Sequence, residues 1–148
     1  MSRKLREKAK NILNKEEGTI YKGNPGLISV ALAYPNRYFV GMSNLGLQSI
    51  YSILNRRGDT VAERVFLPDM KDINEYKRTD TRLFSLESQR MIIDFDILAF
   101  SVSFENDYPN ILSILSLSGI PLESSERGDE YPLVIAGGVC TFFNPEPI

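Results

Sequence analysis

The sequence predicts an α/β domain with a mainly parallel sheet covered by helices. Short apolar runs suited to strands recur along the chain, helical patterns lie between them, and glycine or proline residues separate the elements. Strands that alternate with helices are typical of parallel sheets with right-handed crossovers. The length of 148 residues is enough for one such domain with a substantial core.

A basic helical segment is predicted at the N-terminus. Residues 3–15 have the composition and apolar spacing of a surface helix, and chain-breaking residues follow it. We therefore divide the chain into a helical extension, residues 1–26, and a core domain, residues 27–148. Residues 3–22 carry seven Lys or Arg and three Glu. Because the rest of the chain is acidic, we interpret them as a solvated helix face rather than a nucleic-acid or membrane contact.

The core begins with one strand–helix unit. The first strand is predicted over residues 27–34, an apolar run that Pro35 ends. A helix follows over residues 45–57, because its apolar residues recur at helical spacing and Asn44 or the serine before it can cap the first turn. Gly58 is a suitable residue to end that helix.

The next part of the chain is less regular. A second strand is predicted over residues 60–66, where apolar and polar side chains alternate in a way that predicts burial of one face. Residues 68–85 are charged and irregular, and we assign them no element. A short helix is expected over residues 85–93.

A second strand–helix–strand unit completes the core. The third strand, over residues 96–103, is apolar enough to be buried on both faces. Asp107 is predicted to cap a helix over residues 108–118, which Gly119 ends. A polar loop then leads to the fourth strand, over residues 133–139.

The composition is that of a soluble globular protein, with 43% hydrophobic and 24% charged residues. No apolar run approaches the roughly 18 residues that a membrane span needs. The N-terminus lacks the apolar segment of a secretory signal, so a cytoplasmic location is expected. The sequence contains one cysteine, Cys140, and no histidine. These counts exclude an internal disulfide, a cysteine-only metal site and any imidazole chemistry.

Any ligand site is expected beyond the carboxyl ends of the strands, where parallel α/β sheets bind ligands. The loops after the first, third and fourth strands span residues 34–46, 101–107 and 137–144. They hold most of the polar and glycine residues that the elements leave unexplained. In the last loop the pair Gly137-Gly138 would let backbone amides approach a ligand without a Cβ in the way.

Aromatic side chains also gather in these loops, where a place in the core is less natural. They fit either the lining of a flat apolar ligand pocket or an interface with a further domain, and the sequence favours neither. The aromatic residues are Tyr34, Tyr38, Phe39, Phe104, Phe142 and Phe143.

The loop after the first strand matches no common nucleotide motif. It lacks the Gly-x-Gly-x-x-Gly fingerprint of dinucleotide-binding domains. Gly41 and Gly46 have a spacing similar to that of a phosphate loop, but Leu47 and Gln48 stand where Lys and Ser or Thr are needed. Its Pro-Asn-Arg start is a poor substitute for a flavodoxin phosphate loop. The acidic residues of a receiver domain are also missing from the ends of the first and third strands.

Nucleophilic catalysis is not indicated. Ser101 and Ser103 lie on the same side of the third strand because side chains alternate along it, but no base that could activate them is in evidence. Either hydroxyl fits a hydrogen bond to a ligand or to local backbone. Cys140 lacks a histidine or a clear cationic neighbour, so we interpret it as a bystander.

Three segments, residues 43–58, 96–110 and 133–147, together resemble the N-terminal region of radical S-adenosylmethionine (SAM) proteins that carry a cobalamin-binding-like domain. The resemblance covers residues 27–148. It rests on a Gly-Leu pair at the start of a helix, small polar residues at the end of the third strand, and Gly-Gly followed by Pro-Glu after the fourth.

The resemblance implies a Rossmann-like (flavodoxin-like) domain of three layers, whose carboxyl edge faces the corrin in members that bind cobalamin, with a last strand after Ile148. Because the sequence has no histidine, the Asp-x-His-x-x-Gly signature is absent and cobalamin would bind without a protein imidazole on cobalt. The candidate cofactor-binding residues at this edge are Asn44, Gly46, Ser101, Ser103, Gly137, Gly138 and Thr141.

The resemblance also implies a downstream radical SAM domain in the same chain, which would hold a 4Fe–4S cluster and SAM, because the Cys-x-x-x-Cys-x-x-Cys motif is absent here. The expected function is an accessory domain that presents a cofactor or substrate to that barrel. The alternative is a cofactor-free docking module that engages RNA, protein or the rest of its own chain. An unpaired edge strand would also favour a homodimer. We assign no catalytic residue and no metal ligand.

Overall fold

The computed structural model describes residues 2–23 and 25–147. They form a parallel sheet of four strands in the order β2-β1-β3-β4, which confirms the predicted α/β class. The strands are β1 (Ile28–Tyr34), β2 (Thr60–Phe66), β3 (Ile97–Ser101) and β4 (Leu133–Gly137). The helices are α1 (Arg3–Leu13), α2 (Tyr38–Met42), α3 (Leu45–Arg56), α4 (Met70–Arg78), α5 (Tyr108–Ser118) and α6 (Val139–Phe143). None of the helices in these residues has the length and apolar character of a bilayer span.

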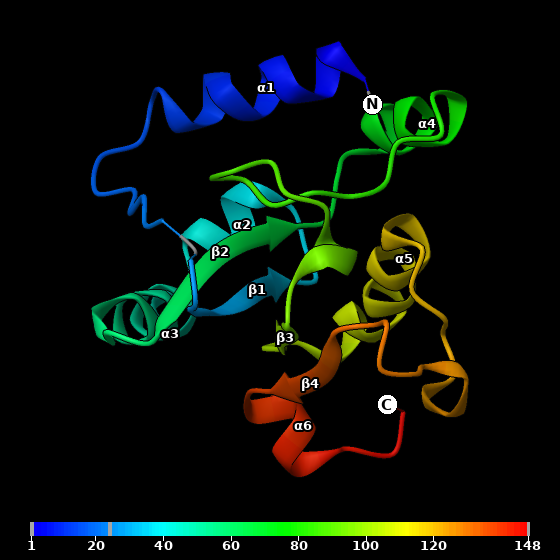
Figure 1. Cartoon of the computed structure of the whole chain (residues 1–148). Helices are drawn as coiled ribbons and strands as arrows, with labels where there is room; N and C mark the ends of the chain where they lie inside the picture. The colour runs from blue at the N-terminus through cyan, green and yellow to red at the C-terminus, as the bar shows by residue number, and fades with distance from the viewer. Residues whose placement is uncertain (1, 24, 148) are drawn as a thin grey trace.

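The helices cover both faces of the sheet and so make three layers (Figure 1). The connection from β1 to β2 runs toward one edge of the sheet, whereas those from β2 to β3 and from β3 to β4 run toward the other. Since crossovers between parallel strands are right-handed, helices from these two groups fall on opposite faces. Accordingly α3 packs on one face, while α1, α4 and α5 border the larger core on the other.

Several local predictions are confirmed. The second strand has the predicted bounds, and the helices predicted from residues 45 and 108 begin at those residues. Asn44 caps α3, since its side-chain oxygen accepts a hydrogen bond of 2.9 Å from the Leu47 amide. Gly119 ends α5 in the left-handed conformation, at φ 71°.

The prediction that β2 is buried on one face only is wrong, because its polar residues are buried as well. Arg64 pairs with Glu87 at 2.6 Å and with Glu16 at 2.7 Å. Glu63 accepts hydrogen bonds from the hydroxyls of Ser85 and Ser88 at 2.5 and 2.6 Å. The segment after α4 therefore lies over β2 and satisfies charges that the alternation assigned to solvent.

The segment between β2 and β3 also differs from expectation. Part of the unassigned stretch forms α4. The short helix expected over residues 85–93 is absent, because the chain turns back on itself there: the Ser85 amide donates to the Arg90 carbonyl at 2.9 Å, and Phe84 and Met91 form an antiparallel bridge. A short 3-10 turn at Ile92–Asp94 then leads into β3.

The N-terminal helix α1 packs against the domain. Leu5, Ala9 and Leu13 are buried in the larger core. At its start the Ser2 amide donates to the Thr81 hydroxyl at 2.9 Å, and Figure 1 shows the N-terminal end of α1 next to α4. The boundary at residue 26 stays a prediction, but the apolar side of the helix contributes to the core.

Candidate functional site

The carboxyl ends of β1, β3 and β4 bring several of the predicted site residues together. The Asn44 side-chain amide donates to the Ser103 hydroxyl at 3.0 Å, which joins the start of α3 to the loop after β3. Ser101 lies opposite Gly137 in the β3–β4 register. The Val102 amide then donates to the Gly137 carbonyl at 2.8 Å, so these loops are bonded to one another at this edge.

Contacts within the domain explain why Asn44, Gly46 and Ser103 occupy their positions. The Asn44 side chain uses its oxygen for the α3 cap and its NH2 group for Ser103. A Cβ at Gly46 would lie 3.0 Å from the Asn44 side-chain oxygen, so glycine leaves room for the cap. These residues tie a helix to a strand end, and a ligand at this point would have to displace that bond.

Replacing Asn44 with alanine is expected to lower the free energy of unfolding by about 1–2 kcal/mol, because the change removes an N-cap and the bond to Ser103. Urea denaturation of the chain would measure the loss. Ser43→Ala is the matched control, since its exposed hydroxyl contacts only the Phe39 carbonyl, and it should cost less than about 0.5 kcal/mol. Equal stability of the two variants would contradict this role of Asn44.

Gly138 is explained by close packing of the backbone. Its φ is 125°, and a Cβ there would lie 2.2 Å from the Val102 carbonyl oxygen. Gly137, by contrast, has open space at the position of a Cβ. The Thr141 hydroxyl donates to the Gly138 carbonyl at 2.9 Å and so stays within the first turn of α6. Within this pair, Gly138 is required by the fold and Gly137 leaves its backbone accessible.

Asp107 is the polar group at this edge whose role the sequence missed. Its side chain makes no cap hydrogen bond to α5, because the 3-10 turn Glu105–Asp107 gives it helical rather than capping dihedral angles. One carboxylate oxygen instead accepts from the side chains of Asn36, at 2.8 Å, and Asn110, at 3.3 Å. Among the described residues the other oxygen has no partner, although Asp107 is only 3% exposed.

Burial raises the pKa of Asp107 above its ordinary value, against the lowering effect of Asn36 and Asn110. A proton on the carboxyl would remove the buried charge, whereas a donor group from outside these residues would pair with the free oxygen. The sequence could not identify Asn36 as a partner of Asp107, because the two residues are 71 positions apart.

Cys140 lies near the same carboxylates but is not poised for reaction. It is buried in α6, and burial together with Glu105 and Asp107 raises the pKa of its thiol. A thiol with a raised pKa is a weak nucleophile at neutral pH. The α6 segment is tied to α5, where the Tyr108 hydroxyl donates to the Asn144 carbonyl at 2.7 Å.

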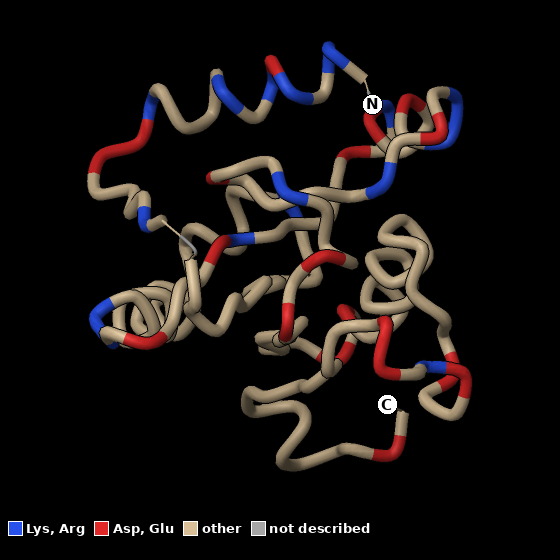
Figure 2. The backbone as a smooth tube through the Cα atoms, in the orientation of Figure 1, with Lys and Arg blue, Asp and Glu red and all other residues tan. Residues whose placement is uncertain are grey.

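The aromatic residues of the edge loops divide into two groups. Tyr34 is buried and Tyr38 is half-buried, with its hydroxyl donating to Glu16 at 2.6 Å. Four phenylalanines remain largely exposed, with Phe142 at 83% and Phe143 at 78%; the other two are Phe39 and Phe104. No charged residue occurs in α5 or from residue 131 to residue 145, and Figure 2 shows α5, β4 and α6 without charge.

The edge therefore carries groups suited to binding rather than to a reaction. Its hydrogen-bonding side chains pair mainly with each other, the pKa of its thiol is raised, and its most exposed residues are aromatic. Of the predicted residues, the structure joins Asn44 to Ser103 and places Ser101 beside Gly137.

Comparison with known proteins connects this domain to one family. The family described as radical SAM proteins, N-terminal, matches residues 46–148, from the second residue of α3 past the end of α6. An uncharacterized protein of Methanocaldococcus jannaschii, MJ0966, is 23% identical over 120 residues. That alignment covers 81% of this chain and 21% of the relative, so the chain spans about a fifth of that protein's length. No solved structure matches the chain.

Proposed function

Because the chain belongs to the N-terminal domain family of radical SAM proteins, we propose that it is an accessory module that docks on the radical SAM domain of its own protein. The parent protein would hold the 4Fe–4S cluster and SAM in that second domain. The module would then present a substrate or cofactor to it from the carboxyl edge of the sheet.

The observation that carries this proposal is an exposed apolar surface formed by β4, α6 and Phe104 in the loop after β3, in which residues 131–145 carry no charge. We call it the β4–α6 surface and define it by its largest exposed apolar side chains. They are Phe104, Leu133, Ile135, Val139, Phe142 and Phe143. Exposed apolar groups gathered in this way mark interaction sites, and β4 also has one edge without a partner strand in the described sheet.

The radical SAM domain is the occupant that the comparisons favour. The family is defined as the N-terminal part of proteins with such a domain, and four fifths of the relative lies outside the matched region. A second copy of the chain, RNA or another protein would be a competing occupant. The lack of basic residues on this surface disfavours RNA, because nucleic acids are bound chiefly through cations.

The edge does not fit a histidine-ligated cobalamin. The sequence offers no imidazole for cobalt, Asn44 and Ser103 are bonded to each other, and the space beside Gly138 is filled by the Val102 backbone. The exposed phenylalanines would suit a flat apolar macrocycle, but they suit a protein interface equally. The proposed function therefore requires no corrin at this edge.

Hydrogen–deuterium exchange tests the docking. Amides of residues 133–143 should exchange more slowly in a full-length protein containing this chain than in the 148-residue chain alone. Phe142→Ser with Phe143→Ser should abolish that protection and lower SAM cleavage about tenfold or more. Met70→Ser is the matched control, because Met70 is exposed on α4 near the opposite edge of the sheet, and it should preserve both.

Three results would overturn the proposal. The first is equal exchange of residues 133–143 in the chain alone and in the full-length protein. The second is a dimer of the 148-residue chain that the double phenylalanine variant dissociates, since a second copy would then cover the surface. The third is saturable binding of hydroxocobalamin, followed by absorbance, that the same variant abolishes.

A further inference from the structure

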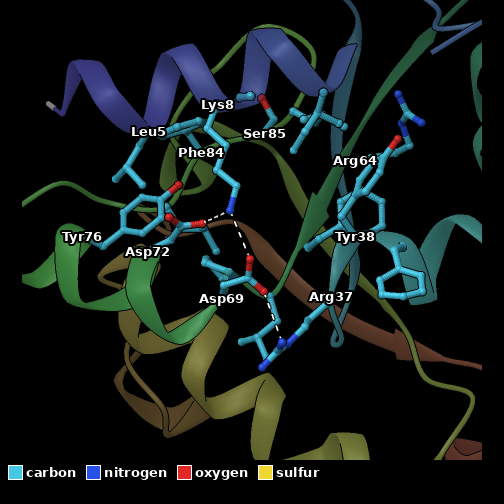
Figure 3. A pocket seen from close by; sticks show the side chains of 18 residues that line it. Leu5, Lys8, Arg37, Tyr38, Arg64, Asp69, Asp72, Tyr76, Phe84 and Ser85 are labelled. Atoms are coloured by element: carbon cyan, nitrogen blue, oxygen red, sulfur yellow. Dashed lines mark hydrogen bonds and ion pairs between the residues drawn. The ribbon is translucent and has the colours of Figure 1, made fainter. Parts of the chain in front are cut away.

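A second candidate site lies at the carboxyl end of β2, where the sequence predicted none. A partly open cavity of about 380 Å³ lies between α1, α4, the start of α2 and the segment after β2 (Figure 3). Its walls are mainly apolar and include Leu5 and Ala9 from α1, Phe66 and Leu67 at the end of β2, and Phe84. A volume of this order is typical of small-molecule sites, which often lie beyond the carboxyl ends of parallel strands.

A row of alternating charges borders this cavity. Asp69 lies between two cations, with one oxygen 3.1 Å from Lys8 Nζ and the other 3.4 Å from Arg37 Nη1. Lys8 also pairs with Asp72. The order along the row is therefore Arg37, Asp69, Lys8, Asp72, as the dashed lines in Figure 3 show. The row is balanced, with two positive and two negative groups.

These ion pairs can be exchanged for contacts with a ligand. The side chains of Lys8, Asp69 and Arg37 are each about half exposed, at 47%, 48% and 55%. Ion pairs of that exposure contribute little to stability, so a ligand can displace one at little cost. Burial alone would lower the pKa of Lys8, but its bonds to Asp72 and Asp69 outweigh this and raise it, which keeps the amine cationic.

We propose that this cavity binds a small zwitterion with an apolar body, of which an α-amino acid with a large apolar side chain is the simplest case. The apolar group would occupy the space between Ala9 and Phe84, the carboxylate would pair with Arg37, and the ammonium would pair with Asp69. A purely anionic ligand at Arg37 would be repelled by the neighbouring Asp69, and a purely cationic ligand at Asp69 would be repelled by Arg37 and Lys8. The cavity lies at the β2 edge of the sheet, so this inference is independent of docking at the β4–α6 surface.

Calorimetric titration of the 148-residue chain with L-phenylalanine, L-leucine and L-methionine tests the proposal. Two comparators each lack one charge: 3-phenylpropionate has no ammonium and phenethylamine has no carboxylate. We expect L-phenylalanine to bind at least about tenfold more tightly than either, which corresponds to about 1.4 kcal/mol. Failure of all three amino acids to bind the folded chain, or equal affinity for L-phenylalanine and both comparators, would overturn it.

Two variants separate charge recognition from cavity filling. Asp69→Asn should weaken L-phenylalanine about tenfold while leaving 3-phenylpropionate unchanged or tighter, because the substitution frees Arg37. Ala9→Phe should fill the cavity and abolish binding of every probe. Glu7→Gln is the control on the exposed side of α1. If Asp69→Asn weakened L-phenylalanine and 3-phenylpropionate alike, or Ala9→Phe left binding intact in a folded chain, the assignment would be wrong.

Discussion

Replacing Arg64 with alanine is expected to lower the free energy of unfolding by about 3–5 kcal/mol, the cost of breaking a buried charge network from one side. Arg64 is 2% exposed on β2. Its guanidinium contacts Glu87 and Glu16 and lies 4.7 Å from the centre of the Tyr51 ring. Without it two buried carboxylates would lose their cation. Urea denaturation followed by circular dichroism would measure the loss.

The stability lost in the Arg64→Ala variant should depend on pH. Burial already raises the pKa of Glu87 in the native chain, against the lowering effect of Arg64, whereas the pKa of Glu16 is lowered with the help of Arg64. In the folded variant both pKa values would therefore rise, because the burial of these carboxyls would no longer be opposed by the guanidinium. The folded state then binds more protons than the unfolded state, so the stability of the variant falls as pH rises through this range. We expect a smaller difference from the native chain at about pH 5 than at about pH 8.

A surface ion pair provides the control for Arg64. Arg78 pairs with Glu75 in the exposed last turn of α4 at 3.0 Å, and Arg78→Ala should cost less than about 1 kcal/mol. Arg64→Lys keeps the charge but not the forked geometry, so it should be intermediate. An Arg64→Ala variant as stable as Arg78→Ala would show that the network contributes nothing to the fold.

Replacing Gly138 with alanine is expected to cost about 2–6 kcal/mol. A side chain at φ 125° adds backbone strain of about 1–3 kcal/mol, and overpacking adds a similar amount, since the new Cβ would lie 2.2 Å from the Val102 carbonyl oxygen. The new Cβ would clash with backbone atoms of Val102, so rotation of a neighbouring side chain cannot relieve the clash. Thermal and urea unfolding would give the loss.

The neighbouring glycine makes this test specific. Gly137→Ala should change stability by less than about 0.5 kcal/mol, because nothing lies within 4 Å of its Cβ position. The contrast distinguishes a glycine required for packing from one that leaves space for a ligand. Two variants of equal stability would contradict the close approach of Gly138 to β3.

Elements whose signals lie in consecutive residues could be predicted closely. The bounds of β2 agree with the prediction, and α3 and α5 follow from helical spacing with Asn44 and Gly119 at their ends. The helix α4 was missed because charged residues outnumber apolar ones in it. The order of its charges could have indicated the helix. Asp72 lies in the first turn and Lys77 and Arg78 lie in the last, an arrangement that interacts favourably with the helix dipole.

The candidate sites were predicted less completely, because each depends on contacts between distant segments. The carboxyl edge was located from loop composition, but the partners of Asp107 come from the β1 loop and from α5. The cavity at β2 requires α1, which the sequence set apart from the core, to lie across α4. Lys8 meets Asp69 across 61 positions of sequence, a pairing that no local pattern contains.

By itself the sequence determined the α/β class, the position of most strands and helices, and the family, because apolar periodicity, caps and short motifs are local properties of the chain. Only the tertiary structure decided which polar residues are buried. Charged side chains are expected at the surface, whereas Glu63, Arg64 and Glu87 are all buried. Their burial is tolerable because the fold brings each a partner from another segment, and the free energy of a buried charge depends on that partner rather than on its neighbours in sequence.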